Sequence, residues 1–432
     1  YNVVLIVADA LRADHLGCYG YARKTSPTID RLASEGVLFT QMFSQSSVTG
    51  AAHVAMLASR LPTDVGLLEN SGVVPDSVQT LAEVLRGCGY ATGAFVSNNV
   101  LTRELMRGLE QGFAVYDCKL PTFEPNRLLW RRECKDTNAA ALAWLGKAPE
   151  PFFLWVHYLA PHGPYATRAT EKVREFEGDA IAAAQHRWLP HLKENWGPNG
   201  IPRYQMVSGL HDAASYIARY DAYTFEMDAA VGELLAALKS KGVAERTLVA
   251  LTSDHGESLG EHGYYFQHGH DLTEEVLRVP LILSLPGGPR DLRVTSLAQM
   301  VDLMPTVLDA VRLRDQLPRG ARGISLLSKP KRGRAPGRTV ISAVISHTTH
   351  KPVYSARRGD WKLILSQGGA GPRLFFLPKD PGEMENLAST RPKVLAEMSA
   401  ELAAHLRRPY QRGPARMDQQ TREVLRALGY LN

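Results

Sequence analysis

Cysteine is scarce in this sequence, and long hydrophobic runs are missing. The 432 residues contain only four cysteines, and no two of them form a Cys-x-x-Cys pair. Such sparse and irregular cysteines exclude a disulfide framework, so we expect packing residues or free thiols. No stretch approaches the roughly 20 consecutive apolar residues that a transmembrane helix needs. We therefore expect no membrane span in this segment.

Charge of one sign is not in large excess either. Lysine and arginine total 50 against 44 aspartate and glutamate residues, which gives a formal net charge of +6. This balance does not indicate a nucleic-acid partner. The 44% of hydrophobic and 22% of charged residues are typical of a soluble globular protein. Because the chain begins inside an apolar run, we leave the compartment open between cytoplasmic and periplasmic or secreted.

Short apolar runs rich in β-branched residues alternate with helical patterns along the chain. This alternation predicts an α/β fold in which a mostly parallel sheet is covered by helices. The clearest helical patterns cover residues 76–88 and 216–240. The clearest strands are expected at residues 3–8, 92–97, 152–156 and 248–253.

Polar residues follow each of these four strands. They are Asp9, Asn98 with Asn99, His157, and Asp254 with His255. Ligands of open parallel sheets bind outside the carboxyl ends of the strands, so we expect these side chains to meet at one site. Polar residues also end ordinary strands, so the prediction depends on the residue types rather than on their positions.

The chain divides into a large and a small unit. We expect a catalytic domain over residues 1–330 and a C-terminal α+β subdomain over 339–432, joined by the basic, proline- and glycine-rich linker 328–338. A hairpin of the subdomain should turn at Gly359-Asp360. Residues 163–215 have little strand pattern, and we interpret them as a lid or substrate-recognition insertion, with a plain loop as the alternative.

Two carboxylates and an imidazole are candidates for a metal site. Asp9, Asp254 and His255 come from separate strand ends and could enclose one divalent cation with open coordination positions. An oxygen-rich set with one nitrogen suits Mn²⁺, Zn²⁺ or Fe²⁺ better than Ca²⁺. The alternative is that Asp9 caps a turn and that the other two lie in a surface loop. We find no second set of aspartate and histidine, so we expect a single ion.

A nucleophile is expected in the segment QSSVTGAAHVAMLAS. Thr49 stands before an alanine-rich helix that should begin near residue 51, where free backbone N–H groups favour an anionic group. A metal ion could lower the pKa of this hydroxyl and make it competent to attack. His53 lies one helical turn later and should face the same side. Ser46 or Ser47 could act instead, and Thr49 could simply cap the helix.

A glycine-rich loop after the last of these strands contains three further histidines, His262, His268 and His270. Imidazoles at this density could bind a metal, hold an anionic oxygen or protonate a leaving group. A single histidine is more often structural. The density of histidines beside a candidate metal pair favours a functional role.

Several motifs occur in an order that resembles the sulfatase family of the alkaline phosphatase superfamily. They are VVLIVADALRADHLGCYG, PFFLWVHYLAPHGPY, LTSDHGESLGEHG and HGHDLTEEVLRVPLIL, followed by GDWKLIL, DPGEMENL and LRALGYL. The resemblance covers nearly the whole chain. It implies a large α/β domain with one metal site and a smaller C-terminal four-stranded sheet. It also implies that Asp9 is a metal ligand and that His162 is an active-site histidine.

The chain departs from this family at the nucleophile. Type I sulfatases carry a C/S-x-P-x-R sequence whose first residue is oxidised to formylglycine, and Thr49, Ala51 and His53 occupy its three fixed positions here. Threonine cannot become formylglycine. The implied ligand set is Asp9, Thr49, Asp254 and His255, because Ala10 replaces a family aspartate. This set is similar to that of phosphonate monoester hydrolases, phosphodiesterases and phosphoethanolamine transferases.

Other departures concern the substrate pocket. The family's Lys-x-His falls on Ser97 and Asn99, which we assign to substrate binding together with His157. A further family lysine falls at or beside His268 and His270. These replacements make the anion pocket less cationic, which suits a singly charged substrate better than a dianionic one.

From the sequence we expect a metal-dependent hydrolase of small anionic phosphate or phosphonate esters, most simply diesters or phosphonate monoesters. Thr49 would form a phospho-threonine, while His162 or a loop histidine protonates the leaving group. A sulfuric ester hydrolase is the alternative, and sulfate esters could also be a second activity. Further alternatives are a phosphoethanolamine transferase and a non-catalytic binding protein. The oligomeric state stays open, including a homo-oligomer.

Overall fold

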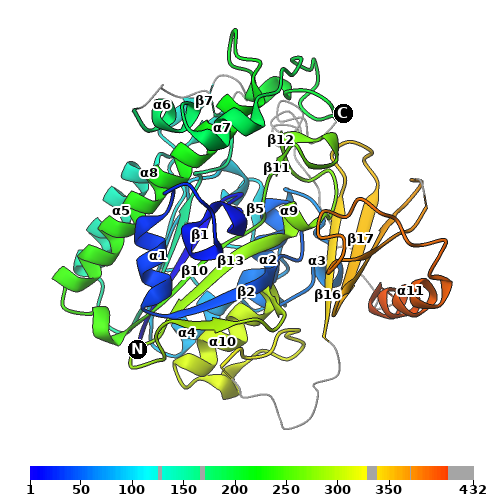
Figure 1. Cartoon of the computed structure of the whole chain (residues 1–432). Helices are drawn as coiled ribbons and strands as arrows, with labels where there is room; N and C mark the ends of the chain where they lie inside the picture. Colours follow the sequence, from blue (N-terminus) through cyan, green and yellow to red (C-terminus); the bar gives the residue numbers. More distant parts are fainter. Residues whose placement is uncertain (125–128, 166–170, 328–337, 370, 407–432) are drawn as a thin grey trace.

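The computed structural model describes residues 1–124, 129–165, 171–327, 338–369 and 371–406. A large sheet lies between two layers of helices, and a smaller sheet with one helix packs beside it (Figure 1). The predicted α/β class is therefore confirmed. In the described part of the chain no helix is long and apolar enough to cross a membrane.

The large sheet is mixed but mostly parallel at its centre. β1 pairs in parallel with β10 and β9, and β4 continues the parallel part, whereas β13 runs antiparallel to both β10 and β2. The order along the sheet is β14 (Leu292–Val294), β2 (Val37–Phe43), β13 (Arg278–Ser284), β10 (Thr247–Ser253), β1 (Asn2–Ala8), β9 (Phe152–Tyr158), β4 (Ala91–Phe95) and β6 (Val115–Asp117), with β15 (Ala298–Gln299) also paired to β2.

The central strands are apolar throughout because both faces of the sheet are covered. In β1, Val3, Leu5 and Val7 belong to one core cluster, and the alternate residues belong to the other. The first cluster packs against α2 (Thr49–Ala58), α4 (Leu81–Gly87) and α10 (Leu303–Ala310). The second packs against α1 (Pro27–Ser34), α5 (Cys134–Lys147) and α8 (Ala213–Ser240).

Two helices begin at different residues from those predicted, and side-chain caps explain both. α4 starts only after Thr80, whose hydroxyl accepts the Glu83 N–H at 3.2 Å while the Glu83 carboxylate accepts the Thr80 N–H at 2.8 Å. α8 starts earlier than predicted because Asp212 accepts the Ser215 N–H at 3.2 Å.

The C-terminal part forms a four-stranded antiparallel sheet. Its hairpin turns at Gly359 and Asp360 as predicted, and Gly359 has the positive φ of 58° that glycine tolerates. Its elements are β16 (Thr339–Ile345), β17 (Pro352–Arg358), β18 (Trp361–Ser366), β19 (Arg373–Phe376) and α11 (Pro392–Leu406). Residues 328–337 of the expected linker and the LRALGYL motif lie outside the described residues.

The segment between His162 and α8 lies over one end of the large sheet (Figure 1). Its two short helices, α6 (Glu171–Glu177) and α7 (Ala180–Gln185), pack against α8. The stretch that follows them reaches the loop after β10, where the Gly197 N–H donates to the side chain of Gln267 at 3.0 Å. This contact brings the insertion next to the carboxyl ends of the central strands.

Candidate active site

The two predicted metal-binding carboxylates lie side by side at the carboxyl ends of neighbouring strands. β1 and β10 pair so that Ala8 faces Ser253, and the next residue of each strand is therefore Asp9 and Asp254. Both carboxylates are fully buried. Ligand atoms of Asp9, Asp254 and His255 all lie within 4.8 Å of one another, so the parallel register brings the predicted group together.

His255 is oriented by its own backbone neighbour. Its Nδ1–H donates to the Gly256 carbonyl at 2.8 Å, which places the lone pair on Nε2. That atom lies 3.3 Å from Thr49 Oγ1, 3.6 Å from Asp254 Oδ2 and 3.7 Å from Asp9 Oδ1. The four residues that the sequence assigned to metal binding therefore converge around one point.

The donor set fits a divalent cation. Asp254 Oδ1 accepts the N–H groups of Ala10 at 3.1 Å and His255 at 2.9 Å, whereas Oδ2 is buried without a hydrogen-bond partner. Burial disfavours the charged carboxylate, but the rings of His255 and His53 outweigh it and keep the pKa of Asp254 below its usual value. Three oxygens and one imidazole nitrogen match the preferences of Mn²⁺, Zn²⁺ or Fe²⁺.

Asn98, which the sequence placed at a strand end without assigning it a role, also contacts this group. Asn98 Nδ2 donates to Asp9 Oδ2 at 2.5 Å, and its Oδ1 accepts the Val100 N–H at 2.9 Å. The predicted substrate residues on either side face elsewhere. Ser97 is hydrogen-bonded to Thr137 Oγ1 and to the His157 carbonyl, so its hydroxyl does not face the Thr49 group.

The reason for this correction lies after β4. The strand ends at Phe95, and Asn98 caps the 3-10 turn Asn99–Leu101 that follows it. Both Asn98 and Asn99 line a small side cavity, and the Asn98 amide is the one that also donates to Asp9. Of the two asparagines that the sequence placed at this strand end, Asn98 is therefore the one that contacts Asp9.

Thr49 is the first residue of α2, two residues earlier than expected. Val48 is the N-cap residue, and Thr49 is 1% exposed. Its hydroxyl stands at the N-terminus of a ten-residue helix, where backbone N–H groups favour negative charge. The next amide, Gly50 N–H, donates to Asn70 Oδ1 at 2.8 Å and fixes the helix start. This geometry places the hydroxyl at the edge of the carboxylate pair.

His53 and His157 lie behind this group, against the core. Their ring centroids are 5.2 Å apart, and both side chains are fully buried. His53 Nδ1–H donates to the Thr49 carbonyl at 2.8 Å, and His157 Nε2 lies 3.5 Å from Asp9 Oδ2. Burial lowers the pKa of the His53 ring below its usual value. Burial also lowers the pKa of His157, to about 3, so the His157 ring is neutral near pH 7.

His268 lies beside His255, and His162 lies beside His268. The ring centroid of His268 is 4.3 Å from that of His255 and 4.9 Å from that of His162. His268 Nδ1–H donates to Glu257 Oε1 at 2.9 Å, and Glu257 Oε2 accepts the Tyr165 hydroxyl at 2.9 Å. Glu257 is fully buried. It fixes the tautomer and orientation of His268, a role that no sequence signal indicated.

Two residues from distant segments lie beyond His268. Trp196 comes from the insertion and His347 from the loop after β16, and their ring centroids are 4.4 Å apart. Their centroids lie 6.1 and 6.5 Å from that of His268. The insertion and the C-terminal subdomain therefore both contribute side chains next to the site.

The structure places two predicted catalytic histidines outside the Thr49 group. Gly269 has a φ of +72°, and this left-handed turn sends the side chains of His268 and His270 to different surroundings. The His270 ring stacks on Tyr264 with centroids 3.9 Å apart. His262 lies instead with Glu275 and Glu383. Neither ring contacts Thr49, Asp254 or His255 in the described contacts.

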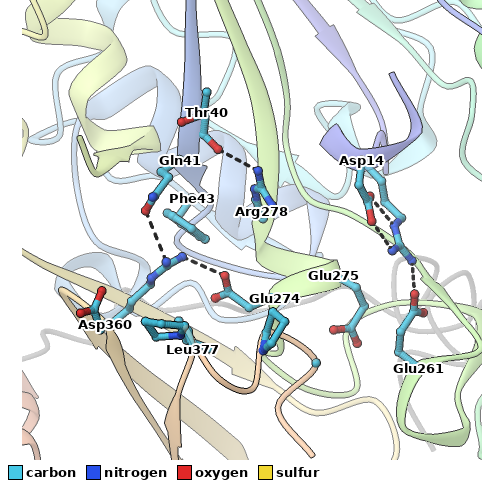
Figure 2. A pocket seen from close by; sticks show the side chains of 15 residues that line it. Asp14, Thr40, Gln41, Phe43, Glu261, Glu274, Glu275, Arg278, Asp360 and Leu377 are labelled. Carbon is cyan, nitrogen blue, oxygen red and sulfur yellow. Dashed lines mark hydrogen bonds and ion pairs between the residues drawn. The ribbon is translucent and has the colours of Figure 1, made fainter. Parts of the chain in front are cut away.

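A cavity of about 600 Å³ lies between the large domain and the C-terminal subdomain, and it is not this site (Figure 2). Positively and negatively charged side chains both line its wall. Arg12 pairs with Asp14 and Glu261, and Arg357 pairs with Glu274. Because these two arginines are already neutralised by carboxylates, they do not make this cavity a cationic pocket for an anionic ester.

Comparisons with known proteins identify the family. The family model described as Sulfatase matches residues 1–313. Arylsulfatase K of Bos taurus is 26% identical over 456 residues, which cover 94% of this chain and 82% of that protein. Iduronate 2-sulfatase of Mus musculus is 28% identical over 336 residues, which cover 66% of this chain and 59% of that protein.

Solved structures share the fold. A 2-O GAG sulfatase superposes with a TM-score of 0.73 at 23% identity, covering 94% of this chain and 92% of that chain. The phosphonate monoester hydrolase of Agrobacterium radiobacter also gives 0.73, at 21% identity and with 94% and 96% covered. A family model that matches most of the chain, a site that could hold a metal ion and this shared fold lead to one conclusion. The chain belongs to the sulfatase family and is a hydrolase of ester bonds.

Proposed function

We propose that this protein is a metal-dependent sulfuric ester hydrolase that uses the Thr49 hydroxyl as its nucleophile. The proposal depends on one observation, the convergence of Thr49 Oγ1 with Asp9, Asp254 and His255 at the carboxyl ends of the central strands. From the sequence we ranked phosphate and phosphonate esters first. Curated relatives named arylsulfatase K cover 94% of the chain and support sulfate esters instead.

The charge of the site agrees with a sulfate ester. In the described part of the chain, no lysine or arginine contacts Thr49, Asp254 or His255. A phosphate monoester carries two negative charges near neutral pH, and a sulfate monoester carries one. A site without direct cationic side chains suits the singly charged ester, because fewer charges must be neutralised in a buried environment.

The chain's own residues can divide the reaction into two displacements. When bound by Asp9, Asp254 and His255, a divalent cation supplies positive charge beside the nucleophile and the ester oxygens. The Thr49 hydroxyl loses its proton to water, and its oxygen forms a bond to sulfur while the bond between sulfur and the leaving oxygen breaks. The product of this step is a sulfo-threonine.

His268 is suited to transfer a proton to the leaving group and to accept one from the attacking water. As an imidazolium it would protonate the leaving alkoxide, and Glu257, which accepts its Nδ1–H at 2.9 Å, would stabilise the charged ring. The neutral ring would then take a proton from the water that attacks sulfur. The sulfur–Thr49 bond breaks in that step, sulfate leaves and the threonine hydroxyl is restored. His162, 4.9 Å from His268 between ring centroids, is the alternative proton donor.

Phosphonate monoesters and phosphodiesters are a second candidate class. Two observations favour them: an unmodified threonine stands at the nucleophile position, and a phosphonate monoester hydrolase shares the fold. Their reacting centres are also singly charged. The same displacement would then form a phospho-threonine.

A comparison of rates tests the proposal. We would measure kcat/KM on the p-nitrophenyl esters of sulfate, phenylphosphonate and phosphate and on bis-p-nitrophenyl phosphate, with Mn²⁺ or Zn²⁺ present. We expect sulfate to be cleaved fastest, and Thr49→Ala to lose on the order of 10³-fold or more while keeping its fold. Thr49→Ser, which keeps a hydroxyl, is the matched control and should remain active. Faster cleavage of the phosphonate or the diester would show that the second substrate class is preferred to sulfate esters. An active Thr49→Ala variant would refute the assignment of Thr49 as the nucleophile.

A further inference from the structure

A second cluster of metal-ligating side chains lies behind the first. It consists of His53 from α2, His157 from β9 and Asp254, and their ligand atoms all lie within 4.8 Å of one another. All three side chains are fully buried. Their segments are far apart in the sequence, so no spacing motif indicated the cluster, and we expected a single ion.

The three residues present buried polar atoms that no protein group satisfies. His53 Nε2, both ring nitrogens of His157 and Asp254 Oδ2 have no hydrogen-bond partner. A buried polar atom without a partner destabilises the folded protein. Several such atoms in one cluster indicate that a ligand satisfies them, because polar groups in protein interiors are otherwise almost always paired.

The orientation of the rings favours a cation. His53 Nδ1–H donates to the Thr49 carbonyl at 2.8 Å, so the lone pair of this ring is on Nε2. A neutral His157 ring offers one lone pair and one N–H, and neither of its nitrogens is hydrogen-bonded to His53 or to the Asp254 carboxylate. Two imidazole nitrogens and one carboxylate oxygen form a donor set typical of Zn²⁺.

Asp254 joins the two clusters. Its Oδ1 is occupied by two backbone N–H groups, and its Oδ2 lies 3.6 Å from His255 Nε2 in the first cluster. A carboxylate oxygen of Asp254 also lies within 4.8 Å of a ring nitrogen of His53 and of His157 in the second cluster. The Asp254 carboxylate therefore lies near imidazoles of both clusters. Paired metal sites about 3.5–4 Å apart recur in hydrolases of anionic esters.

We propose that His53, His157 and Asp254 bind a second divalent cation of the Zn²⁺ class, with Asp254 bridging the two ions. The second ion would balance the charge of the carboxylate pair, a task that no lysine or arginine performs at Asp254 in the described residues. It would also hold His53, and through it the Thr49 carbonyl, in a fixed position. This inference does not depend on the nature of the ester that is cleaved.

Metal stoichiometry tests the proposal. The full chain, stripped of metal with a chelator and dialysed against Zn²⁺, should hold two equivalents by elemental analysis. His157→Gln should hold one. The matched control is His262→Gln, because His262 lies with Glu275 and Glu383 in a third group and its loss should leave two equivalents. A wild-type protein with one equivalent, a His157→Gln variant with two, or a loss only in the control would overturn the assignment.

Two further measurements keep the test decisive. If circular dichroism shows that His157→Gln is unfolded, His53→Gln takes its place with the same expectation. Anomalous diffraction at the zinc edge from wild-type crystals should show a peak between His53, His157 and Asp254, and a peak only at His255 would refute the second site. Thr49→Ala separates this inference from the proposed function, because it should abolish turnover and still bind two ions.

Discussion

Replacement of Glu257 by glutamine should reveal how His268 acts. The Glu257 carboxylate accepts the His268 Nδ1–H at 2.9 Å and the Tyr165 hydroxyl at 2.9 Å. Glutamine has nearly the same volume, and its oxygen can still accept from His268 while its NH₂ faces the tyrosine oxygen. Glu257→Gln therefore removes the negative charge behind His268 and preserves the packing.

The expected loss of kcat/KM in Glu257→Gln follows from the change of the His268 hydrogen bond from a charged to a neutral acceptor. A hydrogen bond to a charged partner contributes about 1.5–3 kcal/mol, and one between neutral groups contributes about 0.5–1.5 kcal/mol. The difference of about 1–2 kcal/mol should appear where the ring is an imidazolium, in the step that protonates the leaving group. At 1.36 kcal/mol per factor of ten, kcat/KM should fall about 5- to 30-fold.

The assay uses the leaving group as a reporter of proton transfer. For sulfate esters of alkyl alcohols, which leave only when protonated, we expect the full loss. For p-nitrophenyl sulfate, whose leaving group needs little protonation, we expect almost none. Glu261→Gln, the same substitution in the same loop at a residue that pairs with Arg12, is the control and should show no such difference between the two esters. An equal loss on both esters with Glu257→Gln would refute the role of His268 as proton donor.

Two predictions concern stability. Lys362 is 1% exposed and lies 3.0 Å from Glu274 and 2.8 Å from Glu383, so Lys362→Met should lower the free energy of unfolding, measured in urea, by about 3–5 kcal/mol. The control Lys379→Met, at an exposed residue, should change it by less than about 0.5 kcal/mol. A loss below about 1 kcal/mol for Lys362→Met would contradict this account of the ion pairs. Burial lowers the pKa of His270 from 6.5 to about 4. Between these pH values the unfolded chain takes up a proton at this histidine that the native chain does not. The free energy of unfolding should therefore fall by up to about 3 kcal/mol as the pH drops from 6.5 to 4. His270→Gln should remove this part of the pH dependence, and identical pH slopes of unfolding for variant and wild type would contradict it.

The fold could be predicted because the local patterns and the tertiary structure agree. β1 is apolar at every position and is covered by helices on both faces, so its pattern indicates a buried parallel strand without ambiguity. Asp9 and Asp254 were predictable for the same reason, because both directly follow such strands. The helix starts were less accurate, since the capping hydrogen bonds of Thr80 and Asp212 decide them.

The rest of the site depends on contacts between distant segments. Asn98 rather than Asn99 reaches Asp9 because Asn98 caps a 3-10 turn, and a sequence does not reveal which of two adjacent asparagines does so. Glu257 was not identified because carboxylates are common in loops, and only the structure shows it buried against His268. Gly269 explains why two histidines that are two residues apart do not share one site.

The pairing of β1 with β10 has a consequence for how the protein acquires metal. Because the hydrogen bonds of these strands hold Asp9 and Asp254 together, the two proposed ligands are preorganised by the sheet and would not need an ion to bring them together. The imidazoles beside Asp254 keep its pKa below the usual value, so the folded chain tolerates the charged carboxylate before any ion binds. The metal-free chain should thus already be folded, and an ion bound at these strand ends would add stability to a folded protein rather than start its folding.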